Sequence, residues 1–119
     1  MTLSELEKAI LREIRIIRPD IARALDEQLE DMIVVSRENT NAGFYTTLRP
    51  QKVSTLIKQS RTVGNVFAKI QGMQNPMTFV LFIKDGLVHM LEGASIDEDT
   101  SNIDFSTVKF EIVPATKHH

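Results

Sequence analysis

Residues 78–93 contain two apolar runs joined by Asp85-Gly86, and this segment constrains the fold more than any other part of the chain. Asp-Gly between two strand-like runs is typical of a β-hairpin, because a two-residue type I′ turn needs positive φ at both central positions and these residues tolerate it. The turn predicts an antiparallel register with these pairs: Lys84 with Leu87, Ile83 with Val88, Phe82 with His89, Leu81 with Met90, and Val80 with Leu91.

Residues that oppose each other share a face of the sheet, so this register sorts the hairpin into two faces. Both predicted faces are mostly apolar. One carries Val80, Phe82, His89 and Leu91, and the other carries Phe79, Leu81, Ile83, Val88, Met90 and Glu92. A strand pair of this kind lies centrally in a sheet and is covered on both sides. The sequence leaves open whether helices, the sheet curling on itself, or another subunit provides the cover.

Length and composition predict one cytoplasmic domain. The 119 residues, 42% of them hydrophobic, suffice for a single core. The absence of cysteine excludes disulfides, thiolate zinc sites and cysteine nucleophiles, and it fits a reducing compartment. The net charge is −2 without a block of like charge, so neither nucleic acid nor an anionic membrane is an expected partner. The apolar runs are too short to span a membrane, and the N-terminus does not resemble a signal peptide.

Two amphipathic segments are predicted at the N-terminus. Ser4 and Glu7 have the spacing of a capping box. Apolar residues then recur at helical spacing: Leu6, Ile10, Leu11, Ile14 and Ile17. Pro19 interrupts this period, which resumes over residues 20–29. The sequence therefore predicts either a second helix there or a kinked continuation of the first.

The remaining apolar runs predict strands at 33–38, 44–48, 63–71 and 108–112, in addition to the hairpin. Within 63–71, Val66, Ala68 and Ile70 share one face and Phe67 lies on the other. Residues 51–61 are ambiguous between helix and strand, and no repeat or linker divides the chain. The predicted fold class is α+β, with an N-terminal helix or helix pair packed on a mainly antiparallel sheet of about five or six strands, in a single domain over residues 1–119.

Two blocks of the chain carry a recognisable pattern. The first contains Arg37-Glu38, Thr40 and Gly43 to Thr46, and the second contains Leu81-Phe82-Ile83, Asp85-Gly86 and Leu91-Glu92-Gly93. Together they resemble a family of small bacterial α+β proteins without an assigned function. The resemblance spans roughly residues 20–95 and implies a shared fold and a bacterial source, but no activity or cofactor. The chain departs from the family pattern at Asn41-Ala42, where a glycine and a larger apolar residue are usual, and at Ala94-Ser95, where aromatic residues are usual.

Four residues are candidates for lining a pocket or forming an ion pair: Arg37, Tyr45, His89 and Glu92. An apolar surrounding raises a carboxylate's pKa, so Glu92 is a candidate acid or base, although a structural ion pair is the simpler interpretation. We predict that Glu92 pairs with Arg37, either structurally, which we favour, or as an anchor for an anionic ligand.

Metal sites and cofactors are not expected. His89 is isolated, and His118 and His119 are terminal, where an expression tag is the usual source, so the histidines form no ligand cluster. The acidic residues of the loop before the last strand lack the spacing of a calcium loop, so we expect a solvated loop there: Asp97, Glu98, Asp99 and Asp104. Phosphate-binding, nucleophile-elbow and zinc-protease motifs are absent from the sequence.

Two functional classes remain from the sequence. The first is a non-catalytic interaction or binding module that associates through its sheet, as a homodimer or with another protein. The second is a small-molecule-binding or enzymatic pocket in a curved sheet covered by the N-terminal helices, lined by the four candidate residues. We favour the first class because the sequence contains no catalytic constellation.

Overall fold

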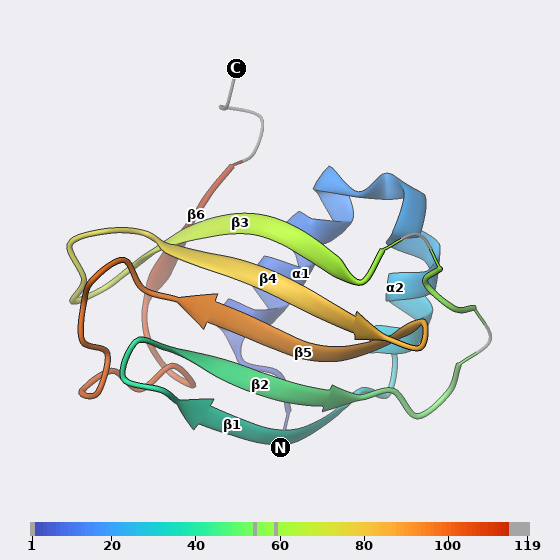
Figure 1. Cartoon of the computed structure of the whole chain (residues 1–119), viewed down its shortest axis with the longest axis horizontal. Helices are drawn as coiled ribbons and strands as arrows, with labels where there is room; N and C mark the ends of the chain where they lie inside the picture. The colour runs from blue at the N-terminus through green and yellow to red at the C-terminus, as the bar shows by residue number, and fades with distance from the viewer. Residues whose placement is uncertain (1, 54, 59, 115–119) are drawn as a thin grey trace.

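The computed structural model describes residues 2–53, 55–58 and 60–114, which form two layers (Figure 1). The helical layer contains α1 (Glu5–Ile17), a 3-10 turn η1 (Pro19–Ile21) and α2 (Ala22–Leu29). The sheet contains β1 (Ile33–Asn39), β2 (Gly43–Arg49), β3 (Thr62–Ile70), β4 (Met77–Lys84), β5 (Leu87–Ala94) and β6 (Phe110–Val113). This arrangement confirms the predicted α+β class.

The strands form one six-stranded sheet in the order β1-β2-β5-β4-β3-β6, and every neighbouring pair is antiparallel. The hairpin of β4 and β5 therefore lies at the centre, as its apolar sequence predicted. Helix α1 packs against β3 and β6, and α2 packs against β5. Both helices consequently lie on the same side of the sheet, behind it in Figure 1.

The start of α1 confirms the predicted capping box. The Ser4 hydroxyl accepts a hydrogen bond from the Glu7 backbone N–H at 3.1 Å, and the Glu7 carboxylate accepts one from the Ser4 N–H at 2.8 Å. At the other end, Pro19 begins the η1 turn, because proline at a first helical position needs no backbone N–H partner. The turn separates the two helices, so residues 22–29 form a second helix rather than a kinked continuation.

The core lies between the two layers. Buried side chains from the helices include Leu6, Ile10, Ile14, Ile21 and Leu25, and those from the strands include Val66, Ala68, Phe79, Leu81 and Leu91. The loop before β6 adds Phe105, whose ring stacks on Phe44 with the centroids 4.3 Å apart. This loop and the helices therefore cover the same face of the sheet.

A β-bulge at His89 changes the predicted register of the central hairpin. Lys84 pairs with Leu87 and Ile83 with Val88, as predicted, but the next pair is Phe82 with Met90, so His89 is an extra residue in β5. The pairs that follow are Leu81 with Leu91, Val80 with Glu92, and Phe79 with Gly93. The predicted pairs beyond Ile83 and Val88 are therefore wrong. Leu91 joins the buried face of Phe79 and Leu81, while Met90 and Glu92 lie on the opposite face.

Other differences from the sequence predictions are local. In the described part of residues 51–61 the chain forms neither helix nor strand. The last strand begins at Phe110 rather than 108, because the backbone N–H groups of Thr107 and Val108 donate to the carbonyl of Asp104 and form a turn. Phe67 does lie opposite Val66 and Ala68, as the alternation of β3 predicted.

Gly93 lies where a side chain has no room. A Cβ atom at this position would be 2.6 Å from the ring of Phe79 and 3.0 Å from the ring of Phe44. These two rings pack edge to face with their centroids 6.1 Å apart. The sequence Leu91-Glu92-Gly93 therefore ends in glycine because two core rings close over this stretch of backbone.

We expect Gly93→Ala to lower the free energy of unfolding by about 2 kcal/mol, since the added methyl group overpacks the contact between Phe44 and Phe79. Chemical denaturation followed by circular dichroism measures the loss. Phe79→Leu removes the obstructing ring, so the double variant is expected to lose less stability than the two single losses together. Full additivity would contradict the steric explanation.

Candidate functional site

The face of the sheet opposite the helices is the broadest candidate site. We define the open face as the half-buried outward side chains of the four central strands: Tyr45, Thr47, Phe67, Thr78, Val80, Phe82, Leu87, Met90, Glu92 and Ala94. Exposed basic side chains of the same strands lie at the margin of this face: Arg49, Lys69 and Lys84. In Figure 1 this face is turned toward the viewer. Single exposed apolar residues are normal on a protein surface, whereas a contiguous apolar patch marks an interaction surface.

The strand register arranges the open face in rows that run across the strands. The central row consists of Thr47, Met90 and Phe82, which are cross-strand partners on β2, β5 and β4. In the next row Glu92 is paired with Tyr45 on one side and with Val80 on the other. Two of the four predicted candidates, Tyr45 and Glu92, are therefore direct neighbours.

The predicted pairing of Arg37 with Glu92 is wrong. Arg37 lies opposite Thr46 on the helix-facing side of the sheet, whereas the bulge places Glu92 on the open face. The guanidinium of Arg37 instead donates to both carboxylate oxygens of Glu7, from Nε to Oε2 at 2.8 Å and from Nη2 to Oε1 at 2.7 Å. This bidentate pair joins the first turn of α1 to β1.

Glu7 is fully buried, and each of its carboxylate oxygens accepts more than one hydrogen bond. Besides Arg37, the donors are the backbone N–H of Ser4 and the hydroxyl of Thr46. Burial raises the pKa of Glu7, but the hydrogen bonds from Arg37, Thr46 and Ser4 and the charge of Arg37 outweigh this effect. The pKa of Glu7 therefore lies below its ordinary value of 4.5. The group stays ionised at neutral pH and acts as a structural anchor.

His89 is exposed at the β-bulge, away from the other three candidates. It lies at one end of the open face beside a shallow depression of about 300 Å³, which we call the end depression. Arg49 and Lys84 also line this depression, and both side chains are exposed. The lining of the end depression is mainly apolar, and its charged groups are the two cations Arg49 and Lys84 and the carboxylate of Asp85 in the hairpin turn.

The four predicted residues thus occupy three separate places. Arg37 is paired with Glu7 on the helix-facing side, Tyr45 and Glu92 are neighbours on the open face, and His89 lies at its end. General acid–base catalysis needs its groups within hydrogen-bond reach of one reacting atom. This set does not converge in that way.

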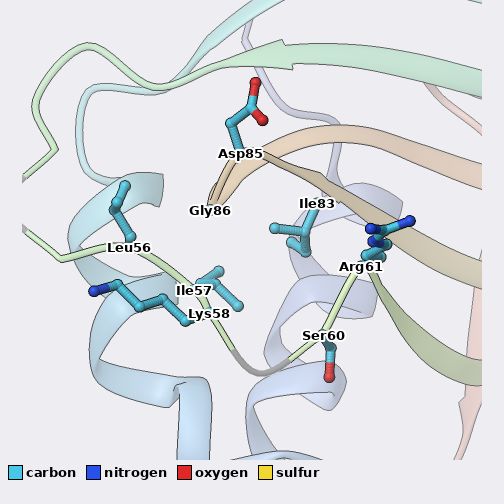
Figure 2. Close-up of a pocket in the computed structure, with 8 residues that line it drawn as sticks. All are labelled: Leu56, Ile57, Lys58, Ser60, Arg61, Ile83, Asp85 and Gly86. Carbon is cyan, nitrogen blue, oxygen red and sulfur yellow. The ribbon is translucent and has the colours of Figure 1, made fainter.

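A larger depression of about 510 Å³ lies beside the β4–β5 turn (Figure 2). Lys58 and Arg61 project from different sides of it, and the Asp85 carboxylate points away from both. Ile57 and Ile83 form its apolar part. The described polar side chains around this depression do not point toward a common centre, so they form no convergent set for catalysis.

The carboxylates of the loop between β5 and β6 bind backbone and hydroxyl groups, either of the same loop or of the loop between β3 and β4. Glu98 accepts hydrogen bonds from the backbone N–H groups of Gln74 and Asn75, both at 2.8 Å, and these bonds lower its pKa. Asp99 likewise accepts from Ser101, which lowers the pKa of Asp99. Within residues 2–53, 55–58 and 60–114 no three His, Cys, Asp or Glu side chains are grouped to hold a metal ion. The terminal pair His118 and His119 lies outside the described residues.

Sequence reasoning missed a second buried polar anchor, Gln28 of α2. Its side-chain N–H₂ donates to the carbonyls of Thr55 and Gly86 at 3.0 and 2.9 Å, and its oxygen accepts from the N–H of Val88 at 2.7 Å. Gln28 therefore attaches α2 to the β4–β5 turn. The available signal was a polar residue between Leu25 and Leu29 in the apolar period, and that signal does not identify a partner.

Comparison with known proteins adds no relative. The chain matches no protein-family model, no curated protein and no solved structure. The resemblance to a small bacterial family therefore stays a prediction. Over the described part of the chain, α1 and α2 are both too short and too polar to cross a membrane. The function has to be inferred from the geometry of the molecule itself.

We expect Glu7→Gln to lower the free energy of unfolding at pH 7 by about 3 kcal/mol, because it removes the carboxylate that binds the Arg37 guanidinium in a bidentate pair. The folded pKa of Glu7 is depressed, so its contribution to stability is present above the unfolded pKa and is lost as the pH falls through the folded value. The stability difference between wild type and variant should therefore shrink below about pH 4.5.

Denaturant titrations between pH 7 and pH 3 measure this difference. Glu5→Gln is the matched control, since Glu5 lies in the same helical turn, is exposed and contacts only Lys8 at 3.5 Å in the described chain. It should change stability by less than about 0.5 kcal/mol. A wild-type advantage over Glu7→Gln that stays constant with pH would rule out an ionised anchor.

Proposed function

We propose that this protein is a non-catalytic interaction module that associates with another protein surface through the open face of its sheet. The observation that carries the proposal is the mainly apolar composition of that face, on the side of the sheet away from both helices. The proposal includes a cytoplasmic location, which fits a chain without cysteine.

The physical argument concerns the central row and its neighbours. Phe82, Met90 and Val80 are incompletely buried, so water still contacts part of their apolar surface. Removing apolar surface from water contributes about 25 cal/mol per Å², which favours any surface that fits this face. Small threonine and alanine side chains separate the larger ones, so the open face is nearly flat. A flat face can pack against a β-sheet or another flat protein surface.

The arrangement of polar groups supports binding over catalysis. Tyr45 and Glu92 lie within the apolar surface as neighbours, while Arg37 is occupied by Glu7 on the other side of the sheet. Aromatic residues with a polar tip and isolated charges are typical of protein interfaces, where they set orientation. Catalytic carboxylates and phenols are activated by an adjacent base, a shifted pKa or a metal ion. The cross-strand neighbour of Glu92 on β4 is the apolar Val80, which supplies no such group.

A photo-crosslinking amino acid in place of Met90 tests the proposal in cells that produce the protein. We expect an ultraviolet-dependent adduct from Met90, because this side chain lies in the centre of the open face. The adduct should disappear when Phe82→Asp is added, since a carboxylate in the neighbouring position must be desolvated on association. Gel mobility and mass spectrometry measure the adducts.

The matched control places the same crosslinker at Ile16, an apolar residue of α1 that is 57% exposed on the far side of the molecule. No comparable adduct is expected there. Phe82→Asp should still unfold cooperatively, because Phe82 is half-buried rather than part of the core. Equal labelling from Met90 and Ile16, or labelling from Met90 that is insensitive to Phe82→Asp, would disprove association through this face.

A further inference from the structure

We infer that the partner of the open face is a second copy of this chain, packed sheet on sheet about a two-fold axis that runs across the strands along the central row. This inference rests on the proposed function and adds the partner and its orientation. The charge pattern on the two sides of the central row carries it.

The acidic and basic side chains nearest the central row lie on opposite sides of it. Farther out, Lys69 on the acidic side is paired with Glu111 on β6, and Asp85 lies in the turn on the basic side. On one side is the acidic row, which continues from Glu92 through Tyr45 to Glu38 on β1. On the other side, Arg49 is two residues beyond Thr47 on β2, and Lys84 is two residues beyond Phe82 on β4. Strand alternation directs both cations to the same side of the sheet as the open face, at its margin, because their neighbours Leu48 and Ile83 are buried on the other side.

The symmetry of a homodimer then selects one axis. Rotation about an axis along the strands would bring the acidic row of one copy against the acidic row of the other, which is repulsive. Rotation about an axis across the strands exchanges the two sides of the central row. The acidic row of each copy then faces the basic residues of its twin, and each contact occurs twice.

The strand spacings give the contacts in this arrangement. Rows two residues apart are separated by about 7 Å and neighbouring strands by about 5 Å. Arg49 of one copy therefore lies over Tyr45 of the other, between Glu38 and Glu92. Arginine fits this position, because guanidinium groups stack on aromatic rings and bind carboxylates. Lys84 approaches Glu92 from the other side.

The end depression provides space for this contact. Arg49, Lys84 and Leu87 all line it, and Leu87 on β5 is the cross-strand partner of Lys84 on β4. A glutamate side chain from the partner would enter between the two cations without displacing a core residue. The depression of about 300 Å³ exceeds the volume of such a side chain, which leaves room for bridging water.

The dimensions of the molecule agree with a dimer of this type. Its extents are 40, 36 and 20 Å, and the open face lies on one of the two broad sides. A standard stable interface buries about 800 Å² on each partner, an area that a face of this breadth supplies. Two sheets with right-handed twist pack face to face at about 30°, with the side chains of the two inner faces interdigitated.

Charge exchange between two variants tests the inference. Glu92→Arg places like charges against Arg49 of an identical copy, and Arg49→Glu places like charges against Glu92. We expect wild type to have twice the monomer mass of 13.5 kDa by light scattering, and each variant to associate at least about a hundredfold more weakly. An equimolar mixture of the two variants restores opposite charges at both symmetric contacts, so the mixture should regain the mass of a dimer.

A second measurement leaves the charges unchanged. The chain has no cysteine, so Thr47→Cys introduces one thiol in the central row, where the axis brings it against the same residue of the twin. A short bismaleimide should crosslink this variant to itself, and the matched variant Ile16→Cys should not react in this way. Circular dichroism verifies that all variants are folded.

Three results would overturn the inference: a wild-type monomer at every accessible concentration, a variant mixture that stays monomeric, or equal crosslinking of Thr47→Cys and Ile16→Cys. The crosslinking experiment at Met90 distinguishes a failure of this inference from a failure of the proposed function. If Met90 forms Phe82-dependent adducts only with proteins of other masses, the second copy is wrong and the interaction module stands. If Met90 forms no such adduct, the interaction module itself is wrong.

Discussion

The structure depends on one constraint: strands β4 and β5 are apolar on both faces, but in the described part of the chain helices cover only one of them. Helices α1 and α2 and the loop around Phe105 all pack on the same side of the sheet. Burial of Phe79, Leu81 and Leu91 there forms the core. Phe82, Val80 and Met90 on the other side lie half-buried in a surface with small polar and apolar neighbours. The core does not need these apolar side chains. Interaction with another protein through this surface, as we propose, is the simplest explanation for them.

Buried polar side chains fix how the helical layer lies on the sheet. Glu7 in the first turn of α1 binds Arg37 and Thr46 on two strands, and Gln28 near the end of α2 binds the β4–β5 turn. Apolar contacts have no direction, so they allow a helix to slide or rotate on a sheet. Each of these anchors would leave an unpaired buried group if its helix moved, and that penalty makes one orientation preferred.

The sequence predicted the fold class well where local chemistry decides the structure. The capping box of Ser4 and Glu7 and the Asp85-Gly86 turn involve only near neighbours, and both are present in the structure. The partner of Arg37 could not be predicted in the same way. It depends on which face α1 covers and on which strand lies at the edge, and neither is encoded by residues near Arg37. The separation of the four candidate residues could not be predicted for the same reason, because it too depends on how distant segments pack.

The bulge at His89 is the feature with the widest consequences, and the sequence held an indirect signal for it. An unbroken register places Glu92 beside Phe79 and Leu81, where a carboxylate without a partner is strongly unfavourable, and it turns Leu91 away from the core. One extra residue reverses both positions: Leu91 becomes fully buried and Glu92 moves to the open face. The predicted register therefore needed a partner for Glu92, and the predicted partner, Arg37, binds Glu7 instead. The same shift gives the open face its acidic row, which supplies the counter-charge for Arg49 in the dimer that we propose.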